Sequence, residues 1–158
     1  MPKISPCLWF DNQAEEAAKH YTGIFPNSKI NRISRYGDTG PGPKGSVMTV
    51  DFVLDGQPYI ALNGGPVFKF TEAISLTVDC KTQEEVDSYW SKLGKGGSES
   101  QCGWLKDKFG LSWQIVPTAL IEMLTDPDPK KANRVMQAML KMVKLEIKDL
   151  VRAYQGEA

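Results

Sequence analysis

The chain has 158 residues, of which 41% are hydrophobic and 24% charged, an ordinary composition for one soluble domain or two small halves that share a core. Nineteen Lys and Arg residues balance nineteen Asp and Glu residues. This balance argues against a nucleic-acid partner and against an anionic membrane surface. No apolar run is long enough to span a bilayer, so we also expect no membrane segment.

The cysteines indicate the compartment. Cys7, Cys80 and Cys102 are an odd number of thiols at unrelated spacings, which favours reduced cysteines over a disulfide framework. Residues 1–6 contain no long apolar core, so we expect no signal peptide. Together these features predict a cytoplasmic protein.

The first half of the chain predicts a strand, a helix and three further strands. Residues 4–10 alternate, with Leu8 and Phe10 on one face and Cys7 and Trp9 on the other. Asp11 and Asn12 can cap the helix that follows, which ends before Pro26. Strand-like segments follow at 30–36, 46–54 and 57–62, and Asp55-Gly56 is a strong hairpin signal between the last two.

The second half repeats this order. Leu8-x-Phe10-Asp11 recurs as Leu76-x-Val78-Asp79, and Thr82 with Glu85 forms a capping box for a helix that stops at Gly94. A short strand near 98–101 and a hairpin turning at 107–110 complete the half. The last strand places Leu111, Trp113 and Ile115 on one face and Ser112, Gln114 and Val116 on the other, and Pro117 ends it. Such a repeat indicates duplicated modules with a shared site between them.

The C-terminal part of the chain is helical in pattern. Residues 120–124 predict a short helix, Asp128-Pro129 predicts the start of another, and a break is expected near 144–146. We therefore divide one structural unit into a first module at 1–66, a second module at 67–117 and a helical segment at 118–158.

Several short sequence motifs resemble those of one known family. They are Pro6-x-Leu8-Trp9-Phe10-Asp11, Phe25-Pro26-Asn27-Ser28, Leu62-Asn63-Gly64-Gly65-Pro66-x-Phe68-x-Phe70 and Gly103-Trp104-x2-Asp107-x2-Gly110-x2-Trp113-Gln114. The set is similar to the vicinal oxygen chelate superfamily, the glyoxalase and bleomycin-resistance fold, and within it to the PhnB-like branch labelled demethylubiquinone methyltransferase-like. The resemblance implies an α+β fold of two β-α-β-β-β modules with curved, mostly antiparallel sheets, plus C-terminal helices.

The methyltransferase label does not carry an activity to this sequence. A glycine-rich cofactor loop belongs between a strand and a helix. Residues 40–45 match G-x-G-x-x-G as letters, but prolines interrupt the match and a predicted strand follows it.

The resemblance also bears on metal chemistry. Metal-binding relatives place ligands on the first and last strands of each module, and these positions fall here at Ser5, Ala61, Ala73 and Gln114. One neutral amide and one hydroxyl do not hold a divalent ion, so we expect no metal and no cofactor. The lone His20 lies beside the apolar stripe of the first helix, where a structural role is expected.

An apolar, aromatic-lined cleft with a few neutral polar groups is the expected site. Its candidate residues face inward from the strands or come from the linker between the halves: Cys7, Trp9, Asn63, Phe68, Phe70, Ser75, Thr77, Cys102, Trp104 and Gln114. The alternative for each tryptophan is a core role, and the alternative for Cys7 is an inert buried thiol rather than a nucleophile.

Four functions remain open at this point. The chain binds a small organic molecule in an inter-sheet cleft without metal, or it is a small-molecule enzyme of lyase, isomerase or transferase type. Alternatively it sequesters a drug without catalysis, or it is an assembly that retains no catalysis. We also expect a homodimer, because the helical segment carries an apolar stripe of Met136, Met139, Leu140 and Val143. Whether its modules are exchanged between subunits stays open.

Overall fold

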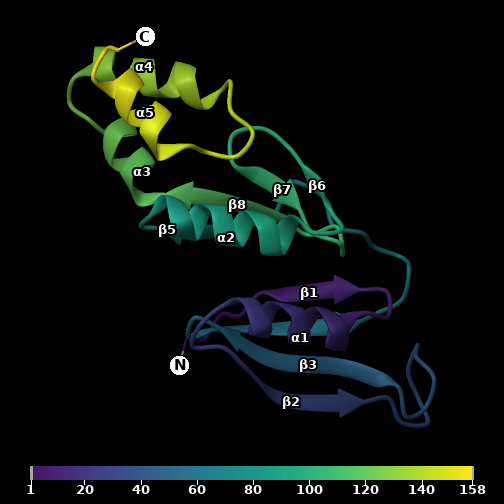
Figure 1. The fold of residues 1–158 in the computed structure, drawn as a ribbon. Helices are drawn as coiled ribbons and strands as arrows, with labels where there is room; N and C mark the ends of the chain where they lie inside the picture. The colour runs from purple at the N-terminus through teal and green to yellow at the C-terminus, as the bar shows by residue number, and fades with distance from the viewer. Residues whose placement is uncertain (1, 158) are drawn as a thin grey trace. The chain divides into compact units, whose positions relative to one another are not determined.

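The computed structural model of this chain describes residues 2–157. The chain forms two compact units that divide between Phe70 and Thr71. Each unit carries a four-stranded sheet, and each sheet has one parallel and two antiparallel pairings. Both units follow the order β-α-β-β-β, which confirms the predicted α+β fold (Figure 1).

The first unit has the strand order β1-β4-β3-β2, and helix α1 packs against strands β3 and β4 of this sheet. Its elements are β1 (Cys7–Phe10), α1 (Ala14–Ile24), β2 (Lys29–Arg35), β3 (Val47–Leu54) and β4 (Gln57–Asn63). The edge strand β1 is shorter than predicted, because its pairing with β4 begins at Cys7 and Pro6 has no N–H to contribute to a ladder. The β3–β4 turn has positive φ at Asp55 and Gly56, 47° and 82°, as the sequence predicted.

The side chain that caps the N-terminus of α1 is not the one that the sequence predicted. Neither Asp11 nor Asn12 is the N-cap; that position is Gln13, whose side chain makes no capping hydrogen bond. Instead, Asn63 at the end of β4 accepts a hydrogen bond from the backbone N–H of Ala14 through Oδ1 at 2.8 Å. A residue far along the chain therefore satisfies a donor of the first helical turn.

The second unit has the strand order β5-β8-β7-β6. Its elements are β5 (Ser75–Cys80), α2 (Gln83–Gly94), β6 (Ser98–Glu99), β7 (Trp104–Lys106) and β8 (Ser112–Pro117). The predicted N-cap is confirmed, since Thr82 Oγ1 accepts from the N–H of Glu85 at 3.1 Å. Glu85 Oε2 accepts from the N–H of Lys81, also at 3.1 Å, and not from that of Thr82 as in a standard capping box. Strand β6 is shorter than predicted, because the chain turns before Cys102, which has a φ of 59°.

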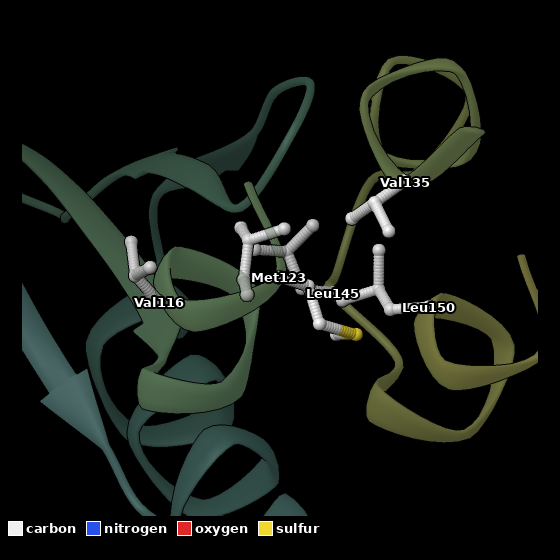
Figure 2. Close-up of a cluster of buried hydrophobic side chains, with 6 residues drawn as sticks. Val116, Met123, Val135, Leu145 and Leu150 are labelled. Carbon is white, nitrogen blue, oxygen red and sulfur yellow. The ribbon is translucent and has the colours of Figure 1, made fainter. Parts of the chain in front are cut away.

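Three helices follow β8: α3 (Thr118–Leu124), α4 (Pro129–Met139) and α5 (Ile147–Tyr154). The predicted start at Asp128-Pro129 is confirmed, since Asp128 Oδ1 accepts from the N–H of Lys130 at 3.0 Å. Figure 2 shows the apolar cluster that joins these helices to the end of β8, formed by Val116, Leu120, Met123, Val135, Leu145 and Leu150.

Residues 140–146 separate α4 from α5, a longer break than the predicted 144–146, and they connect the helices to the hairpin. The carbonyls of Met142 and Val143 accept from the N–H groups of Cys102 and Gly103, each at 2.8 Å. Over residues 2–157, none of the helices combines the length and the apolar character that crossing a membrane requires.

Candidate functional site

One face of the second sheet packs on α2. Leu105, Trp113 and Ile115 on this face are buried, with 1%, 2% and 0% of their surfaces exposed. A Cβ built on Gly94 of α2 would lie 3.7 Å from Leu105 Cδ2, which places α2 over these side chains. The alternation predicted for β8 is therefore confirmed at Trp113 and Ile115.

The opposite side of this sheet, here called the polar face, gathers hydrogen-bonding side chains. Strand register places them in two rows: Ser75, Ser112, Lys106 and Ser98, then Thr77, Gln114 and Trp104. Directly paired residues of neighbouring strands share a face and lie about 4.5–5.5 Å apart at Cβ. Four of the predicted site residues, Ser75, Thr77, Trp104 and Gln114, thus come together within one unit.

A hydrogen bond organises the middle of the polar face. Gln114 Nε2 donates to Ser75 Oγ at 2.9 Å, across the parallel pair β5–β8. Trp104, half-buried, stands directly opposite Gln114 on the antiparallel neighbour. The arrangement offers a fixed amide and hydroxyl beside a flat aromatic surface, which is the composition of a site for a small organic molecule.

A pocket of about 250 Å³ opens at the β6–β7 side of the polar face. It is lined by Trp104, Lys106, Ser112, Ser98 and Glu72, among others. Glu72 forms an ion pair with the ammonium group of Lys106. Sequence reasoning missed Lys106, Ser112 and Glu72. The alternation of β8 had placed Ser112 beside Gln114, and that was the one available signal.

Two of the predicted site residues lie on the first sheet, on the side turned away from α1. The partners of β1 show which side this is: Leu8 pairs with Ala61, both buried, whereas Cys7 is exposed and Trp9 half-buried. The indole Nε1 of Trp9 donates to the carbonyl of Gly65 at 2.9 Å. Desolvation raises the pKa of the Cys7 thiol, which disfavours the thiolate that a nucleophile needs.

The linker aromatics pack on β1. Phe68 makes an edge contact with Trp9, with ring centroids 4.9 Å apart, and Phe70 makes a similar contact with Phe10 at 5.2 Å. Phe68 keeps 63% of its surface exposed. Both predicted linker residues therefore contribute to the first unit, where Phe68 covers part of the Trp9 ring.

Asn63 lies on the α1 side of the first sheet, where it caps the helix. Its Nδ2 donates to the carbonyl of Val47 at 3.1 Å, and the hydroxyl of Tyr36 donates to its backbone carbonyl at 2.5 Å. A second pocket, of about 480 Å³, lies beside it between the loop at 36–47 and the turn after β1. Asn63 thus connects the elements that line this pocket through its hydrogen bonds, and it does not lie on the polar face.

Cys102 and Cys80 do not lie on the polar face: Cys102 precedes β7, and the pairing of Cys80 with Pro117 puts it on the α2 side of the sheet. The backbone N–H of Cys102 is bound to the helical segment, as given above, at the start of the hairpin. Cys80 is fully buried at the end of β5, and burial raises the pKa of its thiol to about 12. A thiol with such a pKa stays protonated at neutral pH and is a weak nucleophile.

The four positions at which metal-binding relatives carry ligands offer only one hydroxyl, of Ser5, and one amide, of Gln114, as side-chain donors. Ala61 is fully buried and pairs with Leu8 and Val50 on the α1 side, so its side chain faces the helix. Ser5 and Ala73 precede β1 and β5, and Gln114 is already bonded to Ser75. Among residues 2–157, no group of three or more His, Cys, Asp or Glu side chains is placed to hold a metal ion.

Two other sequence features have structural roles. The glycine pattern at 40–45 connects strand β2 to strand β3, not a strand to a helix. His20 is half-buried on α1, with its ring centroid 5.8 Å from that of Tyr21.

Comparison with known proteins places the chain among related sequences. The sequence model of the family described as 3-demethylubiquinone-9 3-methyltransferase matches residues 2–116. A solved structure described as a putative 3-demethylubiquinone-9 3-methyltransferase, PhnB protein, from Bacillus cereus is 39% identical. The match covers 74% of this chain and 100% of that chain, with a TM-score of 0.68. No curated protein matches this chain.

More distant structures share the fold alone. Protein PA1353 from Pseudomonas aeruginosa is 18% identical over 74% of this chain and 98% of that chain, with a TM-score of 0.62. The fosfomycin resistance protein FosX from Listeria monocytogenes, in its monoclinic form, is 16% identical over 79% of this chain and 98% of that chain, with a TM-score of 0.56. The family match ends at residue 116, so the helices after β8 lie outside it.

Proposed function

This chain belongs to the 3-demethylubiquinone-9 3-methyltransferase family, a PhnB-like branch of the vicinal oxygen chelate superfamily, and on that premise we propose that it binds a small organic molecule. The binding surface in this proposal is the polar face of the second sheet, around Trp104, Gln114 and Ser75. No bound metal takes part.

The hydrogen bond between Gln114 Nε2 and Ser75 Oγ is the observation that carries the proposal. It fixes an amide and a hydroxyl on a sheet surface opposite a half-buried tryptophan. The amide oxygen of Gln114 and the neighbouring Thr77 hydroxyl add hydrogen-bonding capacity for a ligand. Polar groups set into an aromatic surface are what orients a small molecule in most binding sites.

Binding without a metal follows from the available donors. A zinc or nickel site needs three or four His, carboxylate or thiolate donors around one point. The side chains around Gln114 are hydroxyls, an amide and an indole ring. Methyl transfer is not proposed either, because the glycine pattern at 40–45 joins two strands.

Covalent catalysis is a weaker candidate than binding. Desolvation raises the pKa of Cys7, and burial raises that of Cys80 to about 12, so both thiols are protonated at neutral pH. A reaction on the polar face would depend on neutral groups such as Gln114 and Ser75 orienting a bound ligand.

A small-molecule library screened by thermal shift tests the proposal. At least one compound should raise the melting temperature saturably, and Gln114→Ala should weaken that response about tenfold, since it removes a fixed polar contact. Gln137→Ala, an exposed glutamine on α4, is the matched control and should leave the response unchanged. If every saturable compound responds equally in the Gln114→Ala protein, the binding surface is elsewhere.

The proposal includes a homodimer. Met136, Leu140 and Val143 expose 39%, 57% and 40% of their surfaces on the helical segment, while Met139 packs on the buried cluster. An apolar stripe of this kind is a suitable surface for a second copy. Light scattering at micromolar concentration should give a dimer mass, and Leu140→Lys should shift it to the monomer mass. A monomer mass for the unaltered chain would reject the proposed homodimer.

A further inference from the structure

The pocket at the β6–β7 side of the polar face contains a buried hydroxyl with an unmet hydrogen bond. Ser112 exposes 1% of its surface, and within the described part of the chain its Oγ has no hydrogen-bond partner. Leaving a buried polar group unsatisfied costs about 1–3 kcal/mol, so native proteins rarely do so without a reason, and a bound species is one. Ser112 lines the pocket, so a molecule inside can supply the missing bond.

Ser112 belongs to a row of donors that crosses the pocket. Lys106 pairs directly with Ser112 on one side and with Ser98 on the other. These three side chains therefore share the polar face, at the strand spacing of about 4.7–4.9 Å. Two hydroxyls and an ammonium group in a row favour an acceptor with several oxygens, and a carboxylate has the right size to meet two of them.

The chain itself shows that a carboxylate fits here. Glu72, in the segment before β5, reaches Lys106 and forms an ion pair with it at the pocket wall. The hydrogen bond from Lys106 lowers the pKa of Glu72, so this carboxylate is ionised at neutral pH. The Glu72 side chain is 62% exposed, so it can leave Lys106 for water without being desolvated.

The second carboxylate of the pocket does not compete for Lys106. Glu99 stands opposite Leu105, on the α2 side of the sheet, and its Oε2 accepts a hydrogen bond from the indole of Trp90. Lys106 is therefore the cation that an acidic group in the pocket would meet.

The rest of the pocket limits the size and shape of the molecule. Its volume of about 250 Å³ is below the roughly 300–1,000 Å³ of pockets for drug-sized ligands. The ring of Trp104 forms one wall, and a flat aromatic partner suits such a surface. One ring with one acidic group matches both limits.

We infer that this pocket takes the carboxylate of a small aromatic acid, which displaces Glu72 from Lys106 and satisfies the Ser112 hydroxyl. The inference rests on the proposed function, because it names the class of ligand for the same polar face. Glu72 then acts as an internal competitor that an acidic ligand must replace.

Calorimetric titration of the full-length protein with benzoate, and with the neutral isostere benzamide, tests this assignment. Benzoate should bind at least about tenfold more tightly than benzamide, because only the anion gains the charge-assisted bond to Lys106. Lys106→Met should remove that preference, with Lys148→Met on α5 as the matched control. Glu72→Gln should tighten benzoate binding several-fold, and Glu84→Gln on α2 should leave it unchanged.

Ser112→Ala separates a ligand contact from a structural role. Removing an unsatisfied buried hydroxyl should keep or raise the melting temperature of the free protein while weakening benzoate binding several-fold. A purely structural serine would not give these two opposite changes together.

Three results would overturn the inference: equal affinity for benzoate and benzamide, no measurable binding of benzoate at millimolar concentration, or unchanged benzoate affinity in both Lys106→Met and Ser112→Ala. A neutral library compound that binds saturably and depends on Gln114 would, in any of these cases, still support the proposed function. The two failures are therefore distinguishable.

Discussion

The indole Nε1 of Trp113 donates a hydrogen bond to Asp107 Oδ2 at 2.8 Å, between side chains that expose 2% and 3% of their surfaces. The other oxygen, Oδ1, accepts from the backbone N–H groups of Phe109 and Leu111 at 2.9 and 3.0 Å. One buried carboxylate thus holds both the β7–β8 turn and a side chain of β8. The next residue, Gln114, lies on the polar face, so Asp107 also fixes the strand that presents the site.

Asp107→Ala should destabilise the protein by about 3 kcal/mol, because three donors lose their acceptor in a buried place. Urea unfolding measures the change through the transition midpoint. Asp38→Ala is the control, since Asp38 pairs with Lys44 at a site where both side chains are more than 70% exposed, and it should change stability by less than about 0.5 kcal/mol. Equal effects of the two substitutions would contradict the role of Asp107.

The hairpin around Asp107 shows which features of the fold local sequence patterns can predict. Gly110 has a φ of 89°, as expected of a glycine in this tight turn, and the alternation along β8 predicted which residues face α2. The N-cap at Thr82 and the helix start at Asp128 were predicted for the same reason, since each involves residues a few positions apart. Contacts between residues a few positions apart can be predicted from the local sequence pattern alone.

Gly97→Ala should destabilise the protein by more than about 1 kcal/mol. A Cβ at Gly97 would lie 2.0 Å from the backbone oxygen of Lys106, and paired backbone cannot move aside as a side chain can. Gly23→Ala is the contrasting variant, because no atom lies within 4 Å of its Cβ position on α1. In a helix this change should stabilise by about 0.5–1 kcal/mol. Thermal unfolding of both variants should give shifts of opposite sign; two shifts of the same sign would argue against the β6–β7 packing.

Leu145→Ala should cost about 2–5 kcal/mol, because Leu145 is fully buried in the cluster that joins the C-terminal helices to β8. Ile121→Ala, at an isoleucine of α3 with 51% of its surface exposed, should cost less than about 1 kcal/mol. Denaturant unfolding monitored by circular dichroism compares the two. An effect of Leu145→Ala no larger than that of Ile121→Ala would show that the helical segment is not anchored there.

The ion pair between Asp87 and Lys144 should contribute stability only over a pH range. Lys144 Nζ lies 2.7 Å from Asp87 Oδ1, and this hydrogen bond lowers the pKa of Asp87 and raises that of Lys144. The contribution is fully present above the unfolded-state pKa of about 3.9 for Asp, and it is lost as pH falls through the lower folded-state pKa. The raised pKa of Lys144 places the other limit above about pH 10.

Asp87→Asn should therefore destabilise the protein at pH 7, by less than about 1 kcal/mol because both side chains are partly exposed. Urea titrations at pH 7 and pH 3 should show this difference shrinking at the acidic pH. Glu84→Gln, on the same helix, controls for loss of a carboxylate in general. A difference that stays constant between the two pH values would exclude the ion pair as its source.

Contacts between distant residues explain what the sequence did not predict. Asn63 caps α1 across 49 positions of sequence, a contact that no local capping signal reports. Ser112 belongs to the candidate site through the strand register, which pairs it with Lys106 and pairs Lys106 in turn with Ser98. Ala61, a position at which metal-binding relatives carry a ligand, faces α1 because it pairs with Leu8 and Val50. Side chains alternate between the two faces of a strand, so a register shift of one residue would have put it on the opposite face of the first sheet.

Two-dimensional ¹H–¹⁵N spectra, recorded while a compound from the library screen is titrated, show which surface binds it. We expect saturable shifts of the Gln114 side-chain amide and of the Trp104 indole, because both lie on the polar face. The indoles of Trp90 and Trp113, which are bonded to Glu99 and Asp107, should stay unchanged. Saturable shifts confined to the pocket beside Asn63 or to the C-terminal helices, with the Gln114 and Trp104 signals unchanged, would show that the polar face is not the binding surface.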